Sequence, residues 1–455
     1  MPTRSLWVVS MVAAALVAPD ARAADGAGAP PPAAAAAPLT LDEAVATALA
    51  GNQLIAAAGA QANAAAAAEA EAKSRRLPRV ELQETYARTT NPVFVFMNLL
   101  GQASFGPGNF AVGPLNRPDP LGNFNTKLSV AQPLYAGGMI AAGAAAAADA
   151  REAAVAERER TRQRVVHQVV EAYSGAALAE AQLKVALEAR ETARAHVKLA
   201  EDLRAAGLVV DSDLLQAKVA LAEVEEFAAR AEADLDLARA GLNVAMGRPQ
   251  ETPVELPERI EERSAPDEPL PTLVAAALAG RRDLQAMQRR VAAAGEMVRV
   301  ARAGSRPEVG LQAQYEMNKE NAPGRDGSNW SVFVAAKFTP FDGGAARARA
   351  RRAEEERTAA AKYDELLRQG AELEVRAAWN DLRVARRRLD LASASAAQAR
   401  AALTIVEDRY KEGLTTIVEL LGAQTSLTAS RTREAAARRD VLLARSSLDL
   451  AVGRL

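Results

Sequence analysis

Alternation of apolar and polar residues marks two segments in the C-terminal half of the chain, at about 308–317 and 330–339. In the first, Leu311 and Tyr315 lie at one parity with Gln312 and Gln314 between them. A period of two residues is typical of a strand with one apolar face. The pattern therefore predicts two strands, each with an apolar and a polar side.

Two weaker segments of the same kind, at about 80–90 and 124–134, lie in the N-terminal half. There Glu84 and Arg88 share the parity of the apolar residues. The chain is thus expected to contain four strands of about 9–11 residues, a length that spans a membrane when the strand is tilted.

Between these segments, apolar residues recur at helical spacing over long stretches that lack proline. The pattern predicts helices at 41–75, 139–205, 211–246, 271–303, 345–411 and 416–452. Thr40 and Glu43 form a capping-box pattern at the first of them. A helix of 67 residues is roughly 100 Å long, and such lengths favour coiled-coil packing between neighbouring helices. The two shorter helices of each half, placed end to end, would extend along one long helix.

The order of elements occurs twice because the chain contains an internal duplication. Gly207-Leu208 corresponds to Gly413-Leu414, and Gly137-Gly138 to Gly343-Gly344, both at an offset of 206 residues. Leu77-Pro78 corresponds to Arg306-Pro307 at an offset of 229, and an insertion of 22 residues in the first half accounts for most of the difference. We expect repeats at 39–248 and 271–455, joined by a Pro/Glu-rich linker at 249–270.

The N-terminus has the pattern of a secretory signal peptide. Arg4 precedes an apolar run from Leu6 to Ala18, and Ala21-Arg22-Ala23 fits a cleavage site. We expect residues 1–23 to be removed and the Ala/Pro/Gly-rich stretch 24–38 to form a flexible leader.

Composition excludes several functional classes. The chain has 56 basic and 57 acidic residues, whereas a nucleic-acid binder carries a net basic surface. It has no cysteine and two histidines, His167 and His196, without metal-ligand spacing. The glycine pairs lack the Lys-Ser/Thr of a phosphate-binding loop. We therefore expect no catalytic, cofactor-binding or metal residues and no enzyme.

The strand count sets a limit on any membrane-embedded form. Four strands cannot close a barrel, since the smallest outer-membrane barrels use about eight, and an open sheet edge in hydrocarbon leaves backbone groups unpaired. Three chains would supply twelve strands. The predicted fold is α+β, a long α-helical coiled-coil barrel plus four transmembrane strands per chain that complete a 12-stranded β-barrel in a trimer.

In this order and spacing, the motifs resemble those of the TolC-like outer-membrane factor family. The resemblance rests on the opening Leu39-Thr-Leu-Asp-Glu-Ala, the junction Gln132-Pro-Leu-Tyr-Ala-Gly-Gly138, and the segments 409–414 and 419–424. It implies a homotrimeric duct in the outer-membrane lipid whose helices lie in the periplasm. Such ducts dock through a periplasmic adaptor (membrane fusion) protein to an inner-membrane pump of RND or ABC type, for efflux or type I secretion.

The resemblance also implies site residues near the two helical turns. The adaptor contacts would be Gly207, Leu208, Val209, Gly413, Leu414 and Thr415. The periplasmic gate would include an apolar ring at Val418, with Ser212 as its repeat mate, near Asp213 and Glu419, and a tether at Arg409 and Tyr410. Gly422 lies where relatives often carry aspartate, which places an acidic gate there in doubt.

Other interpretations of these residues remain open. The turn glycines also suit simple helix C-caps, and Asp211, Asp213 and Glu419 suit first-turn acids that a helix dipole stabilises. Arg409 and Tyr410 could be an exposed arginine and a packed tyrosine. The apolar, Gly/Pro-rich loop 91–123 would lie outside the cell, fold over the barrel mouth, or have no function.

Two further functions compete with the duct. A periplasmic or surface coiled-coil scaffold without a pore would use the same helices, but it would not need the alternating strands. An adaptor protein would need a β-rich module between its hairpin arms, and none is expected between 139 and 246. The cargo is not encoded in any pattern of the sequence, because selection takes place at the pump.

Overall fold

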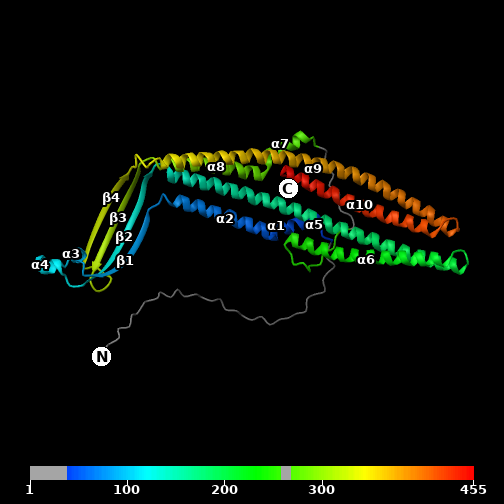
Figure 1. Cartoon of the computed structure of the whole chain (residues 1–455), viewed down its shortest axis with the longest axis horizontal. Helices are drawn as coiled ribbons and strands as arrows, with labels where there is room; N and C mark the ends of the chain where they lie inside the picture. Colours follow the sequence, from blue (N-terminus) through cyan, green and yellow to red (C-terminus); the bar gives the residue numbers. More distant parts are fainter. Residues whose placement is uncertain (1–37, 258–267) are drawn as a thin grey trace, which may run out of the picture.

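The computed structural model describes residues 38–257 and 268–455. The predicted signal peptide and nearly all of the predicted leader lie outside these residues. The described chain is long and narrow, with a layer of helices that leads at one end into a four-stranded sheet (Figure 1). Each helical hairpin turns at the opposite end of the molecule.

The sheet is antiparallel in the order β1-β2-β3-β4. The strands are β1 Arg79–Thr89, β2 Leu121–Ala136, β3 Glu308–Lys319 and β4 Gly327–Lys337. All four predicted strands are present, although β2 is longer at both ends and β4 begins and ends earlier than expected. A register shift between Pro133 and Tyr135 interrupts the pairing of β2 with β3, where proline cannot donate a ladder hydrogen bond.

Cross-strand pairing gives the sheet two chemically different faces. One row of paired residues crosses all four strands and consists of Leu82, Leu128, Tyr315 and Trp330. A second row on the same face consists of Val80, Val130, Ala313 and Val332. Two rows lie on the opposite face. The first consists of Gln83, Lys127, Glu316 and Asn329, and the second of Glu81, Ser129, Gln314 and Ser331. The strand alternation seen in the sequence therefore gives one predominantly apolar and one polar face, although the next row on the apolar side pairs Glu84 with Thr126.

The eight helices of the layer come in two matched sets. They are α1 Leu41–Gly51, α2 Gln53–Ser74, α5 Met139–Ala205, α6 Asp211–Met246, α7 Leu270–Gly280, α8 Arg282–Ala303, α9 Ala345–Lys411 and α10 Ile417–Val452. Corresponding helices have equal lengths of 11, 22, 67 and 36 residues in the two halves. In residues 38–257 and 268–455, no helix combines the length and apolarity needed to cross a membrane.

Two expected helices, 41–75 and 271–303, are each divided into two. The breaks are at Asn52 and Arg281, both of which have extended backbone, and the offset between them is the same 229 residues. The Asn52 side chain caps α2 by accepting from Leu54 N and donates to the Ala245 carbonyl at 3.0 Å. Arg281 donates to the equivalent Ala451 carbonyl at 3.2 Å. The breaks therefore allow a side chain to satisfy the C-terminal carbonyls of α6 and α10.

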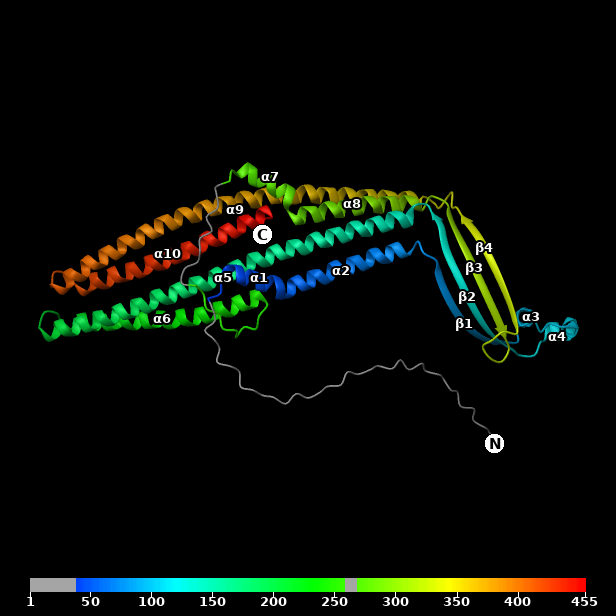
Figure 2. The ribbon, with the colours of Figure 1, turned by 180° about the vertical axis from the view of Figure 1, so that it is seen from behind.

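The helices lie side by side in a layer with two free edges, as Figures 1 and 2 show from opposite sides. Near the sheet the contacts follow the order α2, α5, α8, α9, and toward the hairpin turns they follow α6, α5, α10, α9. The shorter helices thus extend along α5 and α9, as their lengths predict. In the described chain, α9 forms one edge of the layer, and α2 and α6 form the other.

The segment predicted as the loop 91–123 contains helical structure. It includes α3 Pro92–Gly101, a short 3₁₀ helix η1 Pro107–Phe110 and α4 Val112–Asn116, and β2 begins within it. The Asn91 side chain accepts from Val93 N at 3.0 Å, and Pro92 occupies the first helical turn. An asparagine cap followed by proline is a common helix start, so the expectation of a loop over the whole of 91–123 was wrong.

The core is a series of small clusters between crossing helices, many of them built on alanine. In the largest, Tyr173 and Met246 pack with Val254 and Leu256 of the predicted linker. Residues 249–257 of that linker have no helix or strand, and the Gln250 and Thr252 carbonyls accept from Asn243. Residues 249–257 therefore pack against the helical layer.

Candidate functional site

Each long hairpin turns through a glycine with positive φ. Gly207 has φ of 75° and Gly413 has φ of 73°. Leu208 N donates to the Leu203 carbonyl at 2.9 Å, and Leu414 N donates to the Arg409 carbonyl at 2.8 Å. This is the Schellman arrangement, in which a left-handed residue closes the helix end. The two predicted turns are therefore present with the same geometry.

The residues that follow these glycines are exposed at the ends of the hairpins. Leu208 is 69% exposed and Leu414 is 63% exposed, whereas Val209 and Thr415 are half-buried. Isolated apolar side chains at the two tips form a small surface that another protein could cover. The structure thus brings the proposed adaptor contacts together as two adjacent tips (Figure 1).

Behind the tips, the α5–α6 and α9–α10 hairpins pack against each other through one apolar cluster. It consists of Ala200, Leu214, Ala217, Leu403, Tyr410, Ile417, Leu420 and Leu427. Tyr410 is 1% exposed, and its hydroxyl has no hydrogen-bond partner among the described residues. Burial and the charge of Asp213 raise the pKa of Tyr410. In the isolated chain, Tyr410 therefore joins the hairpins by packing, while Arg409 is exposed.

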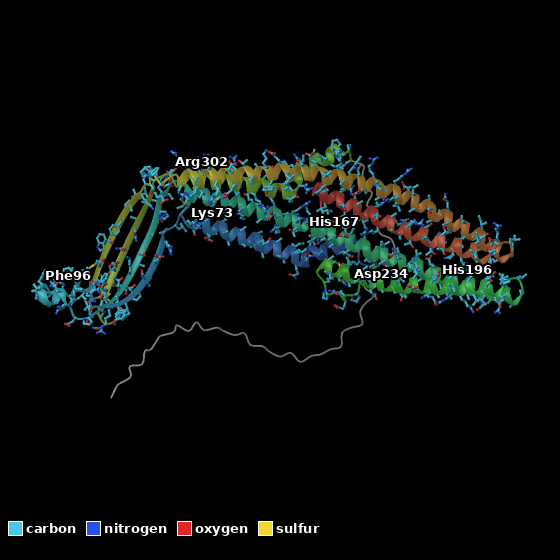
Figure 3. The ribbon with its side chains drawn as sticks, viewed as in Figure 1. Lys73, Phe96, His167, His196, Asp234 and Arg302 are labelled. Carbon is cyan, nitrogen blue, oxygen red and sulfur yellow. The ribbon has the colours of Figure 1, made fainter. Side chains whose placement is uncertain are left out.

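A polar contact next to this cluster was not predicted from the sequence. His196 of α5 is buried, and its Nε2 lies 3.5 Å from Glu407 Oε1 of α9. Burial lowers the pKa of His196, with Glu407 acting in the opposite direction. Figure 3 shows His196 toward the hairpin end of the layer. The pair connects the two repeats, and its members are too far apart in sequence for any local pattern to reveal the contact.

The predicted constriction residues do not take part in the packing between hairpins. Val418 is 62% exposed, and Ser212 and Gly422 are also exposed. Glu419 lies in the first turn of α10, where it accepts a hydrogen bond from the Thr415 hydroxyl. Asp213 lies in the first turn of α6. Val418, Ser212 and Glu419 are thus available to a neighbour, whereas Asp213 is half-buried. Both acids also fit first-turn acids that a helix dipole stabilises.

Comparisons with known proteins agree with this geometry. The family model for outer membrane efflux proteins matches residues 44–248 and 273–454. Protein CyaE of Bordetella pertussis is 33% identical over 58% of this chain and 57% of its own length. Outer membrane efflux protein BepC of Brucella suis is 28% identical over 66% of each chain. The matched stretches therefore span less than two thirds of either relative.

Among solved structures, the fold is similar to that of the Campylobacter jejuni CmeC outer membrane channel. The TM-score is 0.77, with 17% identity over 91% of this chain and 85% of that one. The two stretches matched by the family model each hold one set of the duplicated helices and strands. The chain therefore belongs to the outer membrane efflux protein family.

Proposed function

We propose that three copies of this chain form a passive channel through the outer membrane, with its helical part in the periplasm. Substrates would enter from an inner-membrane pump through a periplasmic adaptor and leave outside the cell. The observation that carries the proposal is a sheet with one apolar face, one polar face and two unpaired edges in the described chain.

The sheet has the chemistry of one segment of a membrane-spanning wall. In the apolar row across the sheet, Leu82 is 74% exposed and Trp330 is 75% exposed. Lipid would cover this face, while the face with Lys127 and Glu316, 3.3 Å apart, would line an aqueous bore. Pairing β4 of one copy with β1 of the next is antiparallel and removes both edges, as hydrocarbon requires.

The free edges of the helical layer carry complementary apolar residues. On the α9 edge Leu373, Val384, Leu391 and Ile405 are exposed, and on the α6 edge Leu215, Val219, Leu237 and Val244 are exposed. Leu237 lies 26 residues after the start of α6, and Val384 lies 27 residues before the end of α9. Because the two hairpins have equal lengths, these residues lie at the same height. The α9 edge of one copy would therefore pack against the α6 edge of the next.

Charge supports the same pairing of edges. Arg387 and Arg388 are exposed one turn after Val384, and Asp234 is exposed one turn before Leu237 (Figure 3). Asp234 and Arg388 each lie 23 residues from the tip end of their helix. Such rim charges contribute little affinity but favour one register between partners.

The seam can be tested by disulfide formation, since the chain contains no cysteine. The double variant Leu237→Cys/Val384→Cys should link copies into a species of three chains under oxidation. Either single variant is the control and should stay unlinked, because one side of each seam lacks a thiol. Species of unlimited length, or no species above one chain, would contradict a closed ring of three.

The hairpin tips would bind the adaptor. Leu208 and Leu414 would fit apolar side chains at the tips of an adaptor hairpin, and the turn glycines would hold them exposed. Replacing Leu414 with Arg should reduce crosslinking to a periplasmic adaptor without affecting the ring of three, because Leu414 lies beyond the seam. Undiminished crosslinking would show that Leu414 is not a contact.

The gate would lie just behind these tips. Val418 and Ser212 would narrow the bore, with Gly422, Asp213 and Glu419 nearby, while Arg409 and Tyr410 would hold the inner hairpin in place. The exposure of Val418 and Arg409 in the single chain supports this, since side chains of a bore have no partner within one copy. The buried Tyr410 would act through packing against the neighbouring hairpin.

A further inference from the structure

The helix α3 lies at the end of the sheet farthest from the helical layer (Figure 1). Its ten residues, Pro92–Gly101, include no charged side chain. Val93, Phe94, Met97 and Leu100 are 64%, 57%, 60% and 53% exposed. Their spacing places them on one side of the helix. An apolar stripe is thus presented by a helix that a single copy leaves uncovered.

The opposite side of α3 is fixed to the polar face of the sheet. Gln102, its C-cap, donates to the Gly122 carbonyl at 2.8 Å and to Asn123 Oδ1 at 2.9 Å. Asn123 donates in turn to Asn318 at 2.9 Å, and Asn98 of α3 lies within 3.5 Å of Asn123. These strand asparagines share the face of Lys127 and Glu316. At the end of the strands, α3 is therefore attached on the side of the sheet that would line the bore, not on the side that would face lipid.

The end of α3 also approaches the backbone of β4 closely. A Cβ atom placed on Gly327, the first residue of β4, would lie 2.2 Å from the Gly101 carbonyl oxygen. Farther along the segment, Phe96, Phe105 and Phe110 stack edge to face, with centroids 4.8 and 5.1 Å apart. The stripe is thus held away from its own sheet, and no described residue of the same chain covers it.

The size of a closed wall determines what can cover the stripe. Twelve strands about 4.8 Å apart and tilted by about 40° enclose a wall of about 12 Å radius. A helix with its side chains is about 10 Å wide, so three helices on the inner side of the mouth cannot avoid one another. The outer leaflet lies on the other side of the wall and cannot reach the stripe.

We propose that the apolar stripes of α3 from three copies pack together at the outer mouth and form a second constriction, opposite the periplasmic one. The inference rests on the proposed channel of three copies. The stripe would bury Val93, Met97 and Leu100 around the axis, and the asparagine contacts would keep each helix on its own sheet.

Single cysteines test this contact directly. Met97→Cys should form a disulfide between copies in the assembled channel, since three equivalent residues meet at the axis. Leu82→Cys, on the apolar face of β1 and even more exposed than Met97 in the single chain, should form none, because lipid would separate the copies. Met97→Cys that stays unlinked overturns the proposal, whether a water-soluble maleimide modifies it (an open mouth) or fails to do so (a lipid contact).

A second variant measures the constriction itself. Val93→Ser/Met97→Ser/Leu100→Ser leaves Asn98 and Gln102 unchanged and should raise single-channel conductance several-fold, because the stripes no longer pack. Unchanged conductance in a variant that still forms three-chain channels would overturn the constriction and leave the channel intact. If the unmodified protein forms no three-chain species and no conductance steps, the channel proposal fails and this inference fails with it.

Discussion

Arg281 is the largest fully buried side chain in the described residues and carries a charge between the two ends of a broken helix. It donates to Asp283 at 2.7 Å and to Glu374 at 2.6 Å, as well as to the Ala451 carbonyl. One guanidinium thus joins three helices at the middle of the layer. At the equivalent break in the first repeat, Asn52 donates to the Ala245 carbonyl and accepts from Leu54 N but makes no ion pair, so the second repeat depends more strongly on its break residue.

Replacing Arg281 with Ala should lower the free energy of unfolding by about 1–3 kcal/mol, because the Ala451 carbonyl and the partly buried Asp283 lose a buried hydrogen-bond donor. The measurement is denaturant unfolding of the purified protein in detergent. Arg282→Ala is the matched control, because the Arg282 side chain is exposed. Its loss should change the free energy of unfolding by about 0.5 kcal/mol or less. Equal effects of the two substitutions would show that the buried network contributes no stability.

His196 predicts a pH dependence of the packing between hairpins. Its pKa in the folded protein is lowered by burial, while Glu407 favours and Lys411 disfavours the charged form. Because the unfolded chain binds a proton more readily, the stability that neutral His196 contributes is present above about pH 6.5 and is lost as pH falls toward the lowered pKa. Acid should therefore loosen the contact between α5 and α9 near the tips.

Hydrogen exchange of the tip segments, compared at about pH 7 and about pH 5 after correction for intrinsic rates, measures this effect. Protection should fall in the unmodified protein, and His196→Gln should lose most of that dependence because glutamine does not titrate. A His167→Gln control should keep the dependence at the tips, since His167 contacts Ser446 far from them. An identical response in the unmodified protein and His196→Gln would contradict the assignment.

At the scale of elements, the two faces of β2 should respond differently to charge. Leu128 lies in the apolar row, and its neighbour Ser129 lies on the polar face. In a membrane, Leu128→Arg should destabilise the folded protein by about 2–4 kcal/mol, whereas Ser129→Arg should cost much less because its side chain reaches water. Folding into lipid vesicles at increasing urea concentrations gives both values. A larger loss for Ser129→Arg would mean that the faces are reversed.

The sequence predicted the long helices α5, α6 and α9 at their observed bounds. This was possible because each is enclosed by glycines that can adopt positive φ, and both repeats carry the same signals. The strands were predictable for a similar reason, since alternation survives wherever the two faces meet different surroundings. Local signals that are strong and repeated therefore determined most of the architecture.

The breaks at Asn52 and Arg281 were missed although a signal existed. Gly51 and Gly280 precede them at the same offset as the surrounding landmarks, but alanine-rich flanks favoured a continuous helix. The short helix α3 was missed because Gly and Pro around it suggested a loop. The contact of His196 with Glu407 could not be predicted, since it depends on how two distant helices rotate against each other. The role of each gate and adaptor residue remains a prediction.

At the scale of the whole molecule, the duplication produces a layer with unlike edges. The two repeats are alike, and α9 of the second corresponds to α5 of the first. Within the chain, α8 and α10 cover one side of α5, whereas the equivalent side of α9 lies at the free edge of the layer. A further copy can cover α9 in the same way, and repeated addition closes a ring if the layer curves by one third of a turn. The same copies would close the sheet, and the helical and strand parts would thus share one symmetry.

Conductance of the purified mature protein in a planar lipid bilayer tests the channel most directly. We expect discrete current steps of uniform size from a detergent-requiring species of three chains, because an aqueous bore must accompany the closed wall. A protein that stays in water as single chains, or that inserts without any current steps, would contradict the account.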